Sequence, residues 1–267
     1  MGRIEAAFNK SKRDGKKGFI PFITAGDPDL QTTAELLVEL SNAGATVIEL
    51  GVPFSDPMAD GPVIQRASER ALKHGSGLQG IFETIASTRA RFETPIVLFS
   101  YLNPLMQYGI ARLARDARAA GVDGILVTDL TPEESHEVVA AARAHDLDLI
   151  FLVAPTSTDE RLRLITEHAS GFVYAVSRAG VTGARENLSG EAESLVTRVR
   201  RFTKLPVAVG FGISSTAQVS ETCTYADAAV VGSAIVSEIE KLAGDPDLVE
   251  KIGSYVRSLT AEETAAA

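Results

Sequence analysis

The amino-acid sequence predicts an α/β fold: a single-domain (β/α)8 barrel (TIM barrel) with an extra helix at the amino terminus. Short apolar runs alternate with longer amphipathic stretches along almost all of the 267 residues. Eight of these runs are apolar at both alternating positions, which is typical of parallel strands buried on both faces. A barrel of this type uses about 250 residues as one domain, so the chain length agrees with the pattern.

The eight candidate strands are four to six residues long and rich in Val, Ile, Leu and Phe. Eight strand–helix units favour closure into a barrel over an open sheet. In chain order the predicted strands are Phe19–Thr24, Thr46–Leu50, Pro95–Phe99, Gly124–Thr128, Leu149–Val153, Phe172–Val176, Pro206–Gly210 and Ala228–Val231.

Amphipathic stretches between the strands predict helices. The stretch Asp29–Ala43 ends at Gly44, a C-cap signal. The stretch Glu133–His145 follows Thr131, a candidate N-cap, and Pro132 at the first helical position. The predicted helices include Asp29–Ala43, Glu133–His145, Ser157–His168, Ser189–Phe202 and Thr216–Cys223.

The two ends of the chain carry further predictions. The helix Arg3–Lys10 presents Ile4, Ala7 and Phe8 on one face and could plug the amino-terminal end of the barrel. We expect residues 1–267 to form one domain and 260–267, which are small and polar, to be a frayed tail.

Composition narrows the possible partners. The net charge is -9, with 35 acidic and 26 basic residues. Such a surface repels phosphate backbones, so we do not expect nucleic acid as a partner. The lone Cys223 fits a reducing cytoplasm, and we expect neither a signal peptide nor a membrane span. The basic cluster between Lys10 and Lys17 is either a binding patch or, as we favour, a solvated turn.

Glu49 interrupts the apolar run Thr46–Leu50 near its carboxyl end, where a barrel of this type holds its active site. Burial costs a carboxylate free energy and raises its pKa toward the range in which it both donates and accepts protons. Glu49 is therefore a candidate acid–base residue. A structural Glu bonded to loop amides is the alternative.

The loop that follows, Val52–Pro62, contains three prolines and the aspartates Asp56 and Asp60. Either aspartate could simply cap the helix after Gly61. Two carboxylates that converge on one barrel mouth would instead suit general acid–base catalysis.

Glycine-rich turns follow the last three predicted strands, at Ser177–Gly183, Gly210–Ser215 and Gly232–Ala234. Glycines let the backbone approach a ligand, and helix amino termini direct N–H groups at an anion. Barrel phosphate sites commonly use the turns after strands seven and eight. The three turns together predict a phosphate site, although each alone could be a tight turn.

The sequence does not place the residues that Schiff-base or metal-dependent catalysis would need. A Schiff-base aldolase needs a lysine at a strand's carboxyl end, whereas Lys204 precedes a predicted strand and Lys73, Lys241 and Lys251 fall on or beside helices. The four histidines fall on helices or helix ends, so no metal site is expected.

The run Ile48–Gly61 resembles the signature of the tryptophan synthase α subunit family. Phe19–Pro28, Ser177–Gly183, Gly210–Ser215 and Gly232–Ser233 extend the resemblance, in the family's order, over nearly the whole chain. It implies a lyase that cleaves indole-3-glycerol phosphate to indole and glyceraldehyde 3-phosphate without metal or organic cofactor. Glu49 would be its main acid–base residue and Asp60 the partner that stabilises positive charge at the indole N–H.

The resemblance also implies a set of substrate-binding residues. The indole pocket or its rim would be formed by Phe22, Tyr101, Leu126, Thr128, Leu152 and Tyr174, with Asp129 at the end of the fourth strand; the phosphate would be held by Gly183, Phe211, Gly212, Ile213, Gly232 and Ser233. Thr182, in a lid at Ser177–Asn187, would close toward Asp60. Thr128 and Ser100 differ from the residues that are commoner in the family at these positions. These differences affect the expected details of the pocket and leave the expected chemistry unchanged.

A partner subunit is implied by the resemblance as well. The family's β subunit carries pyridoxal phosphate and receives indole through a channel, in an α2β2 complex. The loop Pro53–Asp60, Asn103-Pro104 with Tyr108, and the Pro132 region would face it. The alternatives are a free-standing lyase that releases indole and a non-catalytic regulatory barrel that binds a phosphorylated ligand.

Overall fold

The computed structural model describes residues 2–176, 188–210 and 212–261. Eight parallel strands form a closed barrel in which each strand pairs with its neighbours in sequence and β1 pairs with β8. The strands are β1 (Gly18–Thr24), β2 (Ile48–Gly51), β3 (Ile96–Ser100), β4 (Gly124–Val127), β5 (Asp148–Val153), β6 (Val173–Val176), β7 (Val207–Gly210) and β8 (Ala228–Val231). The predicted barrel is confirmed, and each predicted strand overlaps an observed one.

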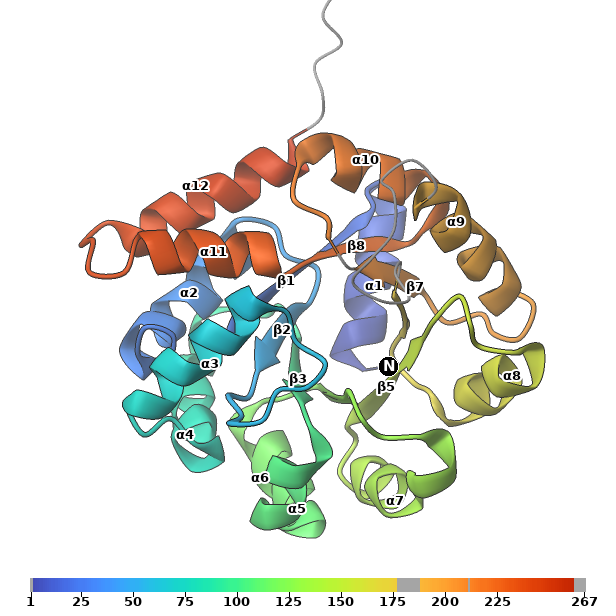
Figure 1. Cartoon of the computed structure of the whole chain (residues 1–267), viewed down its shortest axis with the longest axis horizontal. Helices are drawn as coiled ribbons and strands as arrows, with labels where there is room; N and C mark the ends of the chain where they lie inside the picture. The colour runs from blue at the N-terminus through green and yellow to red at the C-terminus, as the bar shows by residue number, and fades with distance from the viewer. Residues whose placement is uncertain (1, 177–187, 211, 262–267) are drawn as a thin grey trace, which may run out of the picture.

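Helices surround the barrel, as Figure 1 shows in the view down its axis. They are α1 (Arg3–Arg13), α2 (Leu30–Asn42), α3 (Pro62–Lys73), α4 (Leu78–Thr88), α5 (Leu102–Tyr108), α6 (Ile110–Ala120), α7 (His136–Ala144), α8 (Asp159–His168), α9 (Leu188–Val199), α10 (Thr216–Tyr225), α11 (Ser233–Lys241) and α12 (Leu248–Thr260). Two 3₁₀ helices, Arg89–Arg91 and Pro132–Glu134, complete the described elements.

The helix predicted at Glu133–His145 is shorter than expected. Pro132–Glu134 forms a separate 3₁₀ helix, and α7 begins only at His136. Thr131 was expected to cap the helix, but its hydroxyl donates to the Glu134 carboxylate instead, at 3.0 Å. The Thr131 side chain therefore hydrogen-bonds to an acidic side chain and does not cap the backbone of α7.

The core has two layers, one outside and one inside the sheet. Outward-facing strand residues such as Ile23, Leu50 and Leu98 pack against the apolar faces of the helices. Inward-facing residues such as Ile20, Val97 and Phe172 fill the barrel interior. Because successive side chains alternate in direction along a strand, the continuous apolar runs supply both layers.

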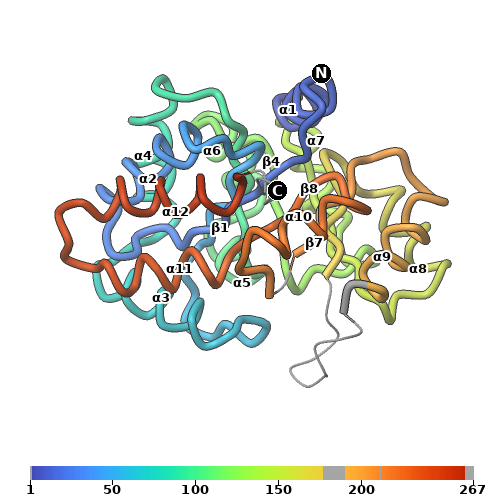
Figure 2. The backbone as a smooth tube through the Cα atoms, turned by 90° about the horizontal axis from the view of Figure 1, so that it is seen from above, coloured from blue at the N-terminus to red at the C-terminus, as the bar shows by residue number. Residues whose placement is uncertain are grey.

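The amino-terminal helix closes one end of the barrel. Ile4 and Phe8 of α1 are buried and belong to the interior cluster, where the Phe8 ring lies 5.7 Å from that of Phe172. Figure 2 shows α1 projecting on one side of the barrel. The predicted plug is confirmed, because these two side chains extend the interior cluster at this end.

The remaining predictions concern the chain end, the domain organisation and membrane spans. The predicted tail, 260–267, lies outside the described residues from 262 onward, and neither it nor the single-domain assignment is tested. Among the described residues, no helix is long and apolar enough to cross a membrane.

The substitution Phe8→Ala tests the plug. Removing a buried aromatic ring costs about 3–5 kcal/mol of unfolding free energy, because the surrounding structure only partly closes the cavity. We expect urea denaturation to show a loss in this range for Phe8→Ala and a smaller one for Phe8→Leu. A loss below about 1 kcal/mol for Phe8→Ala would mean that α1 is not an integral part of the core.

Candidate active site

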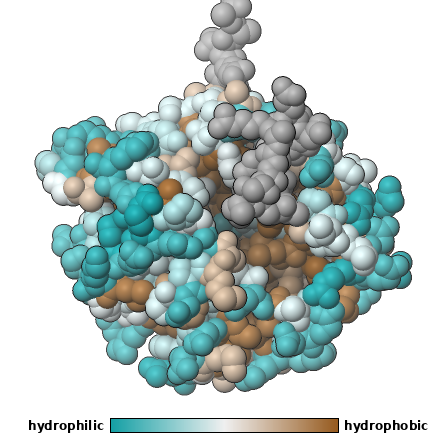
Figure 3. Space-filling model, viewed as in Figure 1, coloured by the Kyte–Doolittle hydropathy of each residue, from teal (hydrophilic) through white to brown (hydrophobic). Residues whose placement is uncertain are grey.

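A cavity of about 370 Å³ opens at the carboxyl ends of the strands. Its volume falls within the range of small-molecule sites. The residues described as lining it are Phe22, Glu49, Ala59, Asp60, Gly61, Ile64, Phe99, Tyr174, Gly212, Ile213, Ser214, Val230, Gly232, Ser233 and Ala234. Figure 3 shows hydrophobic side chains gathered near the centre of this face, with hydrophilic ones around them.

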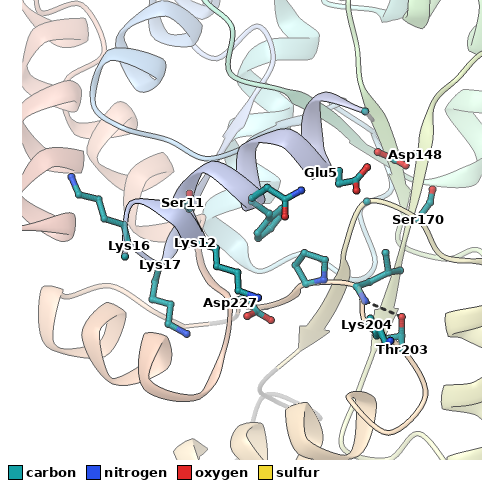
Figure 4. A pocket seen from close by; sticks show the side chains of 17 residues that line it. Glu5, Ser11, Lys12, Lys16, Lys17, Asp148, Ser170, Thr203, Lys204 and Asp227 are labelled. Atoms are coloured by element: carbon teal, nitrogen blue, oxygen red, sulfur yellow. Dashed lines mark hydrogen bonds between the residues drawn. The ribbon is translucent and has the colours of Figure 1, made fainter.

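A second cavity, of about 840 Å³, lies at the opposite end of the barrel. Figure 4 shows its side chains, among them Lys12 on α1, Asp148 at the start of β5, and Lys204 just before β7. Although this cavity is larger, it lies at the amino-terminal ends of the strands, whereas barrel enzymes react at the carboxyl ends. The smaller cavity is therefore the candidate active site.

Glu49 lies on the inner face of β2, level with Phe22 of β1 and Val97 of β3. It is 1% exposed, and its Oε1 atom makes no hydrogen bond within the described residues. Burial raises the pKa of Glu49 to about 8, because the apolar surroundings disfavour the charged form. Glu49 is therefore protonated at neutral pH and has an oxygen free for a ligand.

Tyr174, on the inner face of β6, lies close enough to Glu49 to sense its charge. Burial and then the Glu49 carboxylate raise the pKa of Tyr174 well above its usual range. The Tyr174 hydroxyl occupies the space over Gly210, where a Cβ atom would overlap it. Gly210 was predicted as part of a phosphate-binding turn. In the structure, a glycine is also required at this position because any side chain would overlap the Tyr174 hydroxyl.

Asp60 stands on the loop above Glu49 and is held by Tyr101. The Tyr101 hydroxyl accepts from the Ala59 N–H at 2.9 Å and hydrogen-bonds to the Asp60 side chain. Burial raises the pKa of Asp60 to about 6, and the Tyr101 bond opposes the rise. Asp60 is accordingly mostly ionised at neutral pH, in contrast to Glu49.

The loop itself is fixed at both ends. The Phe54 ring packs on Tyr101 at 5.3 Å, and the Gln65 side chain of α3 donates to the Asp60 carbonyl at 2.9 Å. Neither loop aspartate caps α3, whose N-cap is Gly61 without a side-chain bond. Asp56 is exposed, so of the two aspartates Asp60 is the one directed toward the cavity.

The far wall of the cavity offers backbone N–H groups. Gly232 is the N-cap of α11, and Gly212 has a φ of +77°, a conformation that favours glycine. With Ser214, Ser233 and Ala234 these residues put a helix amino terminus at the cavity wall, where the helix dipole favours an anion. No Lys or Arg is among the described lining residues.

Several predicted site residues meet in this cavity, and others do not. Phe22, Glu49, Asp60, Tyr174, Gly212, Ile213, Gly232 and Ser233 line it, and Tyr101 lines a small adjoining cavity with Asp60. Leu126 and Leu152 pack within the barrel interior, and the Thr128 hydroxyl donates to the Ser100 carbonyl at 3.3 Å. Thr182, Gly183, Phe211 and the predicted lid lie outside the described residues.

The cavity is also lined by the apolar residues Ile64, Phe99 and Val230, which were not predicted as site residues from the sequence. The Phe99 ring meets the Phe22 ring edge-on at 5.2 Å and so extends the apolar wall. Its signal was available, because Phe99 ends a predicted strand. An apolar residue there does not by itself show whether it faces the cavity or the helices.

No described group of three or more His, Cys, Asp or Glu side chains is placed to hold a metal ion. The cavity instead combines one neutral carboxyl group, one ionised carboxylate, apolar walls and an anion-binding helix end. This combination suits proton transfer to and from a partly apolar ligand that carries a negatively charged group.

Known proteins share this chain's sequence and structure over nearly its full length. The family model described as tryptophan synthase alpha chain matches residues 8–264. The alpha chain of Geotalea daltonii is 49% identical over 261 residues, which are 98% of both chains, and that of Solibacter usitatus is 49% identical over 97% of both.

Solved structures agree. Tryptophan synthase subunit alpha from Legionella pneumophila superposes with a TM-score of 0.90 at 39% identity, covering 97% of both chains. A chain of tryptophan synthase from M. tuberculosis, in its aminoacrylate-bound form, gives a TM-score of 0.86 at 34% identity, covering 98% of this chain and 100% of that one. The chain therefore belongs to the tryptophan synthase alpha chain family.

Proposed function

We propose that Glu49 performs the proton transfers of the family's reaction and that Asp60 stabilises the positive charge that develops on the substrate. Membership makes the chain a carbon–carbon lyase that cleaves indole-3-glycerol phosphate to indole and glyceraldehyde 3-phosphate. The observation that carries the residue assignment is a neutral buried carboxyl group and an ionised carboxylate on one cavity. Surroundings that separate the pKa values of two carboxyl groups let one exchange protons while the other stays ionised.

The bond that breaks joins indole C3 to the hydroxyl-bearing carbon of the glycerol chain. Protonated Glu49 gives its proton to C3, so that the ring becomes a cation and can accept the bonding electrons. Asp60 lies at the indole N–H and stabilises that positive charge. The Glu49 carboxylate then takes the hydroxyl proton as the aldehyde forms, which returns Glu49 to its starting state.

The rest of the cavity binds and orients. Phe22, Phe99 and Tyr174 line the cavity and would provide apolar surface for the indole ring. The Gly232–Ala234 end of α11 lines it as well, and its N–H groups would bind the phosphate. Proton transfer and charge stabilisation are all that the cleavage requires, so we assign no step to a metal or organic cofactor. The single Cys223 and the reaction fit the cytoplasm.

The partner of the chain is proposed to be a tryptophan synthase β subunit in an α2β2 complex. Two large hydrophobic side chains stand out from the surface in the segments expected to face it, Met58 at 88% and Met106 at 62% exposed. Met58 lies in the loop that carries Asp60, and Met106 lies on α5. Both side chains would be removed from water in a complex with another protein, and that burial would stabilise the complex.

Substituting Glu49 by Gln tests the acid–base role. Gln has nearly the same shape but cannot donate a proton to C3, so indole release should fall by about 100-fold or more. Substrate binding, measured by calorimetry on the same variant, should stay within a few-fold. Near-normal turnover by Glu49→Gln would remove Glu49 from the mechanism.

The pH profile of kcat/KM should be bell-shaped, because catalysis needs Asp60 ionised and Glu49 protonated. Activity then rises as the pH passes about 6 and falls as it passes about 8, the pKa values of the two groups. Steady-state rates with indole-3-glycerol phosphate between pH 5 and 9.5 check this. A flat profile across that interval would contradict the assigned protonation states.

Adding a β subunit distinguishes the remaining functions. A subunit of a complex should release indole slowly alone and faster when the β subunit is added, and Met58→Glu or Met106→Glu should raise the β-subunit concentration needed for half-maximal activation by about tenfold. Ser220→Glu, at an exposed position of α10 on the opposite side of the barrel from α5, serves as control. High activity alone without activation would indicate a free-standing lyase, and ligand binding without turnover a regulatory barrel.

A further inference from the structure

We propose that Glu240, together with Arg66 and Arg70, fixes the spacing between the acid–base end and the phosphate end of the active site. These three are positioning residues, because none of them is among the residues that line the cavity. The inference rests on the proposed function, since it requires one substrate to engage both ends at once.

Two adjacent helices carry the two ends of the site. α3 begins at Pro62, two residues after Asp60, and its Gln65 side chain holds the Asp60 carbonyl. α11 begins at Ser233, beside the N-cap Gly232 at the anion-binding wall. Figures 1 and 2 both show α3 and α11 side by side.

The contact between these helices is apolar near the cavity. Ile64 and Ala67 of α3 pack with Val236 of α11 and with Phe22 of β1. Apolar packing of this kind is not directional, so small side chains such as Ala67 permit sliding of one helix along the other. A directional contact is needed to fix their relative position.

Ion pairs supply that contact further along the helices, between Arg66 and Arg70 of α3 and the last turn of α11. Arg66 binds the Glu240 carboxylate with two hydrogen bonds, of 2.8 and 2.7 Å. Arg70, one turn further along α3, donates to Glu240 at 2.7 Å and holds Asp27 with two more bonds, of 2.8 and 2.9 Å. Paired bonds between guanidinium and carboxylate fix orientation as well as distance.

The network is anchored in the barrel through Asp27, which lies between β1 and α2. Asp27 is only 2% exposed, so its charge depends on Arg70. Removing the Arg70 side chain would leave that carboxylate buried without a cation. The anchor makes α3 and α11 move as one unit with the carboxyl end of β1.

Helix energetics alone do not explain Glu240. It stands in the last turn of α11, where the helix dipole disfavours a negative charge. The hydrogen bonds from Arg66 and the charge of Arg70 nevertheless lower its pKa to about 2. Its favourable interactions are therefore those that it makes with the neighbouring helix α3.

The spacing matters because indole and phosphate are parts of one molecule. A substrate held at its phosphate presents C3 to Glu49 and N–H to Asp60 only if α3 and α11 keep the matching offset. Misplacement by about 1 Å can cost a factor of 100 in rate. Each product alone engages one end and is insensitive to the offset.

The test compares Glu240→Gln with Glu35→Gln. Glu35 also forms a doubly hydrogen-bonded pair with an arginine, Arg91, at 2.9 and 2.8 Å, but on α2, outside the residues that line the cavity. We expect Glu240→Gln to lower kcat about tenfold, with the Kd of glyceraldehyde 3-phosphate and of indole, measured separately, changed less than twofold. Glu35→Gln should leave kcat unchanged.

A second variant guards against a general loss of folding. Arg66→Met breaks the outer pair but keeps Arg70 on Asp27, and it should lower kcat in the same direction, with Arg66→Lys closer to wild type. A fall in thermal midpoint with kcat equal to that of Glu35→Gln would overturn the proposal. Absence of turnover in the wild-type chain would instead refute the proposed function.

Discussion

A carboxyl group placed inside an apolar barrel is the constraint on which the rest of this structure depends. Glu49 lies level with Phe22 and Val97 and has no cation among the described residues that surround it. The free-energy cost of burying its charge is avoided by keeping the proton, which raises the pKa to about 8. The closed sheet makes this possible, because it surrounds the group with inward-facing side chains that are mostly apolar.

Inside the ring of strands, side chains fill the amino-terminal end, whereas the carboxyl end holds the candidate active site. The larger cavity at the amino-terminal end is lined by α1 and the segments that lead into β5 to β8. At the amino-terminal end Ile4 and Phe8 of α1 add to the interior side chains. At the carboxyl end the inward positions next to the filled layer include Gly51 and Gly210, where a Cβ atom would overlap Phe22 or Tyr174. Glycines at this level let large aromatic side chains turn across the barrel mouth, which leaves room for a ligand above Glu49.

Much of this could be predicted from sequence because it depends on local pattern. Buried parallel strands are continuous apolar runs, so β8 was predicted with its observed bounds. The break between Pro132 and His136 was not predicted, because helix-starting signals do not distinguish a 3₁₀ helix from an α-helix.

The site was predictable where a residue type is out of place in its segment. Glu49 in a strand is such a case, whereas Phe99 looks like any other core residue. The link from Arg70 to Glu240 spans 170 positions in sequence, and no local pattern connects them. Contacts of that kind follow from closure of the barrel, which brings α11 beside α3, and they become visible only in three dimensions.

The chain has a net charge of -9, and the arginines of this network do not supply positive charge for binding an anion in the cavity. Arg66 and Arg70 are held by Glu240 and Asp27, and neither reaches the cavity wall. A phosphate would therefore be stabilised among the described residues by backbone N–H groups and the α11 dipole, which are fixed by the fold. Fixed dipoles bind an anion only where it fits them, so the position of α11 sets both the strength and the place of binding. On the proposed mechanism, backbone dipoles at one end and two carboxyl groups at the other act on one substrate, so catalysis depends on the ion pairs that hold α3 and α11 at a fixed offset.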